Sequence, residues 1–112
     1  HLDLIQRYND TIYPFEKARD IITEILKKII KDNKGIEVNT SSFAYKLKDL
    51  TPSRDILSLY HHLGGKIITV GSDSHKAESV GSHISFVQKE LKNIGFSHFC
   101  TFDKMKPVFH EL

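Results

Sequence analysis

Strand-type and helix-type segments alternate along this chain of 112 residues, and this alternation restricts the fold more than any other feature. From Phe15 the apolar residues recur at intervals of three and four opposite a charged face. This pattern predicts an amphipathic helix that has Pro14 in its first turn and ends at a left-handed Gly35. The β-type run Ile36–Asn39 follows directly, and the run Lys66–Val70 has the continuous apolar character of a strand buried on both faces.

Helix-boundary residues predict two further helices. Thr51 and Pro52 are expected to be the N-cap and the first residue of one helix, which the glycines at 64 and 65 would end. The other is expected to run over residues 82–94, where apolar residues form one stripe, and to close at Gly95.

The remaining strand signals lie near the two ends of the chain. The opening segment "HLDLIQRYND" is expected to be the end of a strand that runs into a loop. The segment "HFCTF" is expected to be a last short strand, and residues 40–50 a polar loop. Strands that alternate with helices favour an α/β fold with a parallel sheet and right-handed crossovers. An open doubly wound sheet and a slice of a (βα) barrel both fit this order. In either fold, reactive residues collect at the C-terminal ends of the strands.

Charge and cysteine content narrow the functional classes. The formal net charge is +2, which does not argue for a nucleic-acid partner or an anionic membrane. No apolar run approaches the roughly 18 residues of a transmembrane helix. The single cysteine, Cys100, permits no internal disulfide, so we expect a reducing compartment, the cytoplasm. Because the chain begins with His1 and not with methionine, we also expect that a segment upstream is missing.

The sequence "GSDSH" places Asp73 and His75 just beyond the predicted strand and Gly71. Residues two apart in an extended segment project to the same side, so both side chains can enter one pocket. A carboxylate beside a neutral imidazole is a partial ligand set for zinc, manganese or iron. The alternative is that Asp73 caps a turn and His75 is a polar loop residue. His83, at the start of the following helix, could face the same pocket.

Four segments, in this order, resemble the C-terminal part of histidinol-phosphatases of the PHP (polymerase and histidinol phosphatase) family. The order "EVNTS", "PSRDIL" and then "GSDSHK" is specific for this branch. The sequence "GSDSH" alone is moderately specific for the superfamily. The resemblance extends over nearly all of the chain, from His1 to about Phe102. The segments are "HLDLIQRY", "IEVNTSS", "PSRDILSLYHHLGGKIITVGSDSHKAESVG" and "LKNIGF".

The resemblance implies that residues 1–112 are the C-terminal part of a single PHP domain, a distorted (βα)7 barrel. It implies two or three divalent metal ions (manganese, zinc or iron) at the C-terminal mouth of the strands. His1, Asp73 and His75 match family metal ligands, and Asp73 and His75 would serve catalysis. The early H-x-H pair, a glutamate and further histidines of the family would lie upstream. Three ligands cannot hold a full multinuclear site, so this segment alone is expected to be inactive.

The implied reaction is the hydrolysis of a small phosphate ester, histidinol phosphate, to histidinol and phosphate in histidine biosynthesis. Arg7 and Arg54 are the candidates for binding the phosphate, since a guanidinium fork suits its oxygens. Arg54 could instead be a surface residue of a helix. One alternative is another PHP-type phosphoesterase, such as a phosphotyrosine phosphatase or a nuclease-like domain of a DNA polymerase. The other is a non-enzymatic α/β module in which the D-x-H sequence is incidental. The sequence leaves the oligomeric state open.

Overall fold

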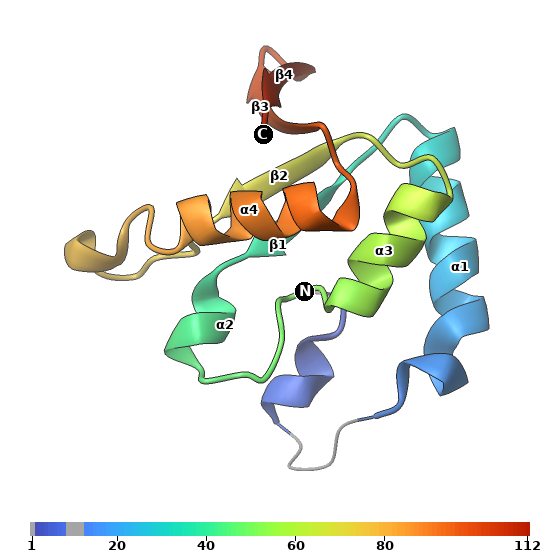
Figure 1. Cartoon of the computed structure of the whole chain (residues 1–112), viewed down its shortest axis with the longest axis horizontal. Helices are drawn as coiled ribbons and strands as arrows, with labels where there is room; N and C mark the ends of the chain where they lie inside the picture. The colour runs from blue at the N-terminus through green and yellow to red at the C-terminus, as the bar shows by residue number, and fades with distance from the viewer. Residues whose placement is uncertain (1, 9–12) are drawn as a thin grey trace.

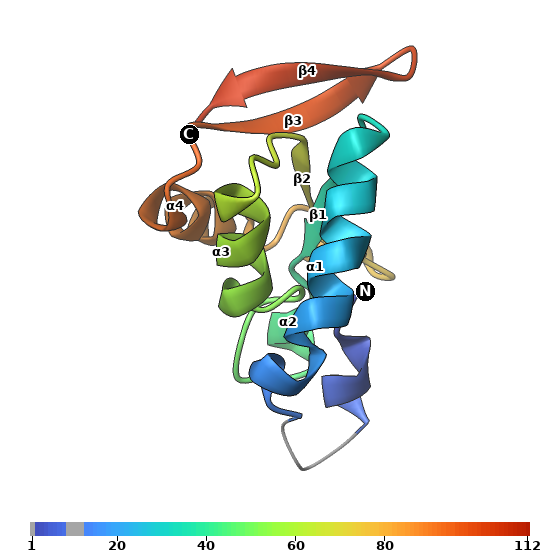
Figure 2. The same ribbon diagram turned by 90° about the vertical axis from the view of Figure 1, so that its right-hand side faces the viewer.

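A computed structural model describes residues 2–8 and 13–112, with only the backbone at positions 6 and 7. Figures 1 and 2 show the longer helices packed beside a short pair of strands, with a β-hairpin across one end of the molecule. Within the described ranges, no helix has the length and apolar character needed to cross a membrane. The elements are η1 (Leu4–Arg7), α1 (Phe15–Lys31), β1 (Ile36–Asn39), α2 (Ser41–Ala44), α3 (Arg54–His62), β2 (Ile68–Gly71), η2 (Ala77–Ser79), α4 (Ile84–Ile94), β3 (His98–Asp103) and β4 (Lys106–Glu111).

Strands β1 and β2 form the parallel pair that positions the rest of the structure. They are in register from Ile36 opposite Ile68 to Asn39 opposite Gly71, so both strands end at the same edge. The prediction of a strand over Ile36–Asn39 is confirmed, and so is the mixed α/β class. The described residues form two separate two-stranded sheets, so they do not by themselves show a barrel.

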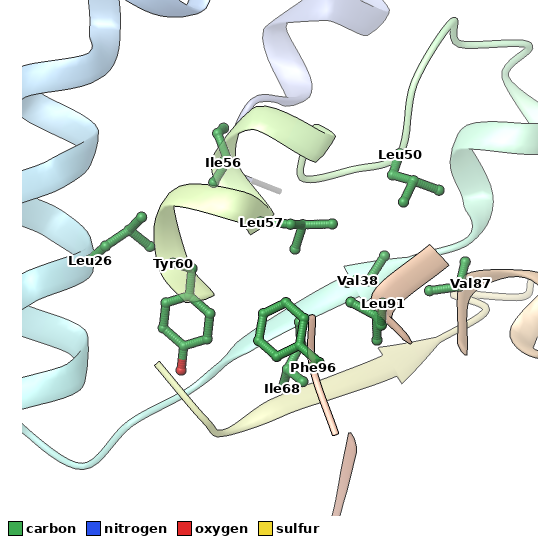
Figure 3. Close-up of a cluster of buried hydrophobic side chains, with 10 residues drawn as sticks. All are labelled: Leu26, Val38, Leu50, Ile56, Leu57, Tyr60, Ile68, Val87, Leu91 and Phe96. Atoms are coloured by element: carbon green, nitrogen blue, oxygen red, sulfur yellow. The ribbon is translucent and has the colours of Figure 1, made fainter. Parts of the chain in front are cut away.

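The hydrophobic core lies on one face of this strand pair. Helix α1 packs against α3, and α3 packs against α4, which also contacts β2. Figure 3 shows their apolar side chains meeting those of the two strands. Burial of such side chains contributes roughly 1.5–3 kcal/mol each, which holds the helices against the strand pair. The buried cluster is Leu26, Val38, Leu50, Ile56, Leu57, Tyr60, Ile68, Val87, Leu91 and Phe96.

The opposite face of the strand pair is more exposed among the described residues. Val38 and Ile68 point into the core and are fully buried, whereas Glu37, on the other face, is exposed and its neighbour Thr69 is only partly buried. The expectation that the strand ending at Val70 is buried on both faces is therefore wrong for the described residues. The core elements cover one face only.

Two helix boundaries differ from the prediction because tertiary contacts occupy the expected cap residues. Helix α1 ends before a left-handed Asn33 (φ 52°), whereas Gly35 is not left-handed. A Cβ at Gly35 would lie 2.3 Å from the carbonyl oxygen of Ile67, so this glycine permits a close backbone approach. Helix α3 has Ser53 as its N-cap and not the expected Thr51. Thr51 instead pairs with β1, because its carbonyl accepts a hydrogen bond from the amide of Asn39 (2.8 Å).

Other boundaries follow the local signals. Gly64, with φ 87°, ends α3 as predicted, and Gly95, with φ 120°, ends α4. Helix α4 begins at Ile84, two residues after the predicted start, and buries Val87 and Leu91 from the expected stripe.

The two ends of the chain depart most from the prediction. Residues 2–8 form a turn and the 3-10 helix η1, so the expected strand is wrong there. The last predicted strand exists as β3, but it pairs antiparallel with β4 and does not join the parallel pair. Figure 2 shows this hairpin across the end of the molecule from which β2 starts. Its turn, Lys104–Met105, has positive φ at both residues without the usual Asn-Gly signature, which is why the hairpin escaped the sequence analysis.

Candidate active site

A cavity of about 460 Å³ opens at the C-terminal ends of β1 and β2. Its walls come from two segments, residues 40–45 after β1 and residues 72–83 after β2. Ligands of parallel α/β sheets bind at this kind of place, because loops from neighbouring strands converge there. The cavity is therefore the candidate active site.

Asp73 and His75 both line this cavity and are both exposed. The prediction that the two residues meet in one pocket is confirmed, but for a different reason from the one expected. Asp73 has φ 47°, in the left-handed region, so the segment is not a simple continuation of the strand. Aspartate enters this region more readily than most residues. The loop after β2, and not strand alternation, brings the two side chains to one cavity.

Serine side chains hold this loop in place. The Ser72 hydroxyl accepts a hydrogen bond from the amide of Gly81 (3.2 Å), which closes the loop across nine residues. The Ser74 hydroxyl donates to the carbonyl of Lys76 (2.5 Å) and accepts from the amide of the same residue (3.3 Å). Such local bonds fix the backbone on either side of Asp73.

Two buried polar residues lie at the end of β1, and one of them connects the two walls. Asn39 and Thr40 are each 2% exposed. The Asn39 side-chain oxygen accepts from the amide of Ser41 (2.8 Å), which starts α2. The Thr40 hydroxyl donates to the carbonyl of Ser82 (2.8 Å), and its amide donates to the carbonyl of Gly71 (2.8 Å). Thr40 thus ties the loop after β1 to the loop after β2.

An aromatic pair forms another part of the wall. The rings of Phe43 and His83 stack with centroids 4.3 Å apart and planes 16° apart, and both residues line the cavity. Phe86 meets Phe43 edge-on at 5.4 Å. The expectation that His83 could face the pocket is confirmed. Phe43 was missed, because it lies in the segment predicted as a polar loop, where the short helix α2 forms instead.

Of the other predicted site residues, only Arg54 has a side chain that the structure describes. His1 lies outside the described residues, and so does the side chain of Arg7. Arg54 is not among the described residues that line the cavity; its Nε donates to Glu90 Oε2 (2.7 Å), and its terminal nitrogens are bonded to Glu90 and Asp49. The hydrogen bond to Glu90 raises the pKa of Arg54 above its usual range. Its role in substrate binding stays a prediction, and its place at the start of α3, with a partly exposed side chain, agrees with the alternative of a surface residue of a helix.

Burial changes the ionisation of two residues away from the cavity. It raises the pKa of Asp3, although the amide of Ser53 donates to this carboxylate (2.7 Å). Burial also raises the pKa of Tyr60, whose hydroxyl donates to the carbonyl of Ile67 (2.9 Å). Asp3 therefore joins η1 to the start of α3, and Tyr60 joins α3 to the start of β2.

The cavity offers part of a metal site. Asp73 and His75 carry an oxygen and a nitrogen donor of the kinds that zinc and similar divalent ions accept. Among residues 2–8 and 13–112, however, no group of three or more His, Cys, Asp or Glu side chains is arranged to hold a metal ion. Two donors are too few to hold such an ion, so a metal ion in this cavity would need ligands beyond the described Asp73 and His75.

Comparison with known proteins agrees with these features, although no protein-family model matches the chain. The chain is 36% identical over 98 residues to a probable histidinol-phosphatase of Thermotoga maritima, covering 88% of this chain and 41% of that protein. It is 36% identical over 109 residues to a histidinol-phosphatase of Lactococcus lactis, covering 95% of this chain and 40% of the relative. A probable histidinol-phosphatase of Clostridium acetobutylicum is 34% identical over 116 residues, with 99% and 41% covered.

A solved structure shows the same similarity in three dimensions. It is the histidinol phosphate phosphatase of Lactococcus lactis in complex with zinc, L-histidinol and phosphate. The TM-score is 0.71 at 30% identity, and the match covers 96% of this chain and 42% of that one. The chain thus spans about 40% of the length of the relatives it matches. The resemblance to histidinol-phosphatases that the sequence motifs indicate is confirmed over nearly the whole chain.

Proposed function

We propose that this chain is the C-terminal part of an enzyme that hydrolyses histidinol phosphate to histidinol and phosphate with the help of divalent metal ions. The observation that carries the proposal is the cavity at the ends of β1 and β2, where Asp73 and His75 lie together. The similar Lactococcus lactis structure, which contains zinc, L-histidinol and phosphate, supports this substrate. A cytoplasmic location remains a prediction.

We propose further that the complete fold is the distorted (βα)7 barrel. Parallel sheets in α/β proteins are usually covered on both faces, whereas the β1–β2 pair has the exposed Glu37 on its second face. Closure of a barrel would enclose this face. A barrel also needs roughly 250 residues, more than twice the length of this chain. The share of about 40% that the chain covers in its relatives agrees with this size.

In the proposed site Asp73 is an anionic metal ligand, and His1 and His75 supply imidazole nitrogens. Divalent ions in such a site neutralise phosphoryl oxygens and lower the pKa of water. Zinc, manganese or iron fits these donors, and two or three ions in the complete enzyme remain a proposal. The chain itself orients the ligands, because Ser72 and Ser74 fix the loop on both sides of Asp73. The proposed phosphate contact is Arg7.

The test is phosphate release from histidinol phosphate by the full-length enzyme, with zinc or manganese present. Removing one metal-ligand oxygen in Asp73→Asn should lower kcat/KM by more than the about 10- to 100-fold typical of outer partners of a metal site. The metal content, measured by mass spectrometry, should fall with it. Asp103→Asn is the matched control, since Asp103 is an exposed aspartate of the hairpin and should behave as wild type.

The outcomes separate the alternatives. An Asp73→Asn variant that keeps wild-type turnover and metal content would refute the proposed ligand. A wild-type enzyme that hydrolyses phosphotyrosine but not histidinol phosphate would be a phosphoesterase of a different kind. A folded protein that binds no divalent metal and releases no phosphate would be a non-enzymatic α/β module.

A further inference from the structure

The stacked rings of Phe43 and His83 form an aromatic part of the wall beside the proposed metal ligands. Both residues line the same cavity as Asp73 and His75. Their planes are 16° apart and their centroids 4.3 Å apart, so the rings cover each other on one side and a further flat ring can stack only on an outer face of the pair. Phe86 supports Phe43 edge-on but is not among the described residues that line the cavity. The pair therefore adds a feature that the proposed metal and phosphate contacts do not use.

His83 has an unfavourable backbone conformation at its place in this wall. His83 is the N-cap of α4 and has φ 60°, a left-handed conformation that suits glycine or asparagine better. The preceding carbonyl, that of Ser82, accepts the hydrogen bond from the buried Thr40 hydroxyl (2.8 Å). An anchored, strained residue in the wall of a site points to a role in that site and not only in folding.

The chemistry of the wall defines what it can recognise. Aromatic faces bind flat rings by offset stacking and bind cations by their negative faces. The phosphate must lie near Asp73 and His75 if the proposed function holds, so the wall is available to the other end of the ester. A simple aliphatic alcohol would gain little from such a surface, whereas a flat nitrogen heterocycle would gain a stacking contact.

We infer that Phe43 and His83 determine specificity by selecting phosphomonoesters whose alcohol carries a flat nitrogen heterocycle. This inference rests on the proposed function, in which the imidazole of histidinol phosphate is that heterocycle. The contact uses the part of the substrate that does not react, and binding energy of this kind can serve the reaction at the phosphate.

The experiment compares two substrates that differ only in the ring. Histidinol phosphate and alaninol phosphate share the amino alcohol and the phosphate, and only the first carries the imidazole. In the full-length enzyme, His83→Asn removes the ring but keeps a residue that tolerates the left-handed N-cap. Phe43→Leu removes the other ring. Each should lower kcat/KM for histidinol phosphate by about 3- to 10-fold and leave that for alaninol phosphate within about twofold.

The control is Phe86→Leu, which loosens the same cluster from behind without changing the cavity wall. It should leave the ratio of the two kcat/KM values unchanged. An unchanged ratio in His83→Asn and Phe43→Leu would overturn the inference while leaving the proposed function intact, and so would an equal loss in Phe86→Leu. If His83→Asn does not fold, Phe43→Leu decides the question. Absence of histidinol phosphate turnover by the wild-type enzyme would overturn the proposed function and this inference with it.

Discussion

Arg54 provides the sharpest test of the difference between the sequence expectation and the structure. Its guanidinium makes it a candidate for binding the substrate phosphate, whereas the structure places it between α3, α4 and the segment before α3. Its guanidinium bonds Glu90, 36 residues away in the sequence, and Asp49. The exposed fractions of the three side chains are 42% for Arg54, 20% for Glu90 and 30% for Asp49. If the structural role is right, Arg54→Met should destabilise the fold without affecting substrate binding.

The expected loss follows from these contacts. Hydrogen bonds to charged groups contribute about 1.5–3 kcal/mol, and fully exposed ion pairs only about 0.2–1 kcal/mol. Because Arg54 is partly exposed and Glu90 is mostly covered, the Arg54–Glu90 contact falls between these limits. Methionine keeps the apolar stem of the side chain. We therefore expect Arg54→Met to lower the free energy of unfolding by about 1–3 kcal/mol, with a coupling of about 1 kcal/mol between Arg54 and Glu90.

The assay is urea unfolding of the full-length wild type, Arg54→Met, Glu90→Gln and the double variant, which together form a double-mutant cycle. Arg19→Met is the matched control, since Arg19 pairs with Glu16 on the exposed face of α1 and should cost no more than about 0.5 kcal/mol. KM for histidinol phosphate should change less than about twofold in Arg54→Met. A KM raised tenfold or more, with stability and coupling unchanged, would refute the structural role and restore the phosphate contact.

Two further predictions concern stability. Tyr60→Phe should lower the free energy of unfolding at pH 7 by about 0.5–1 kcal/mol, because the Ile67 carbonyl also accepts from the amide of Ile36 and stays satisfied. Since burial raises the pKa of Tyr60, the folded state keeps its proton where the unfolded chain, with a pKa of about 10, loses it. The wild type should thus lose stability as the pH rises above about 10. The difference in free energy of unfolding between the wild type and Tyr60→Phe, measured by urea titration, should therefore shrink. A difference that stays constant with pH would contradict this. Gly35→Ala should lower the free energy of unfolding by about 1–3 kcal/mol, because the added Cβ would overlap the carbonyl of Ile67. Gly64 has open space around it, so Gly64→Asn should lower the same free energy by less than about 1 kcal/mol. Equal costs for the two variants would refute the overlap argument.

Much of the framework could be predicted from local patterns. The strand Ile36–Asn39, helix α1 and most of helix α4 follow from β-type and apolar patterns, and the end of α4 also follows from Gly95. The place of Asp73 and His75 follows from a topological rule, since reactive residues collect where parallel strands end. These inferences succeed because periodicity records which face of an element is buried, and a strand end has a defined position in an α/β fold.

The sequence by itself therefore determined the three longer helices, the strands β1 to β3, their order and the strand end at which Asp73 and His75 lie. Only the tertiary structure decided that Phe43 stacks on His83, that Arg54 is held by Glu90 and that β3 pairs with β4. Each of these depends on a partner that local spacing does not identify. An apolar or charged position shows that a side chain needs a contact, but the packing of distant segments chooses the contact, because burial and charge pairing act through space and not along the chain.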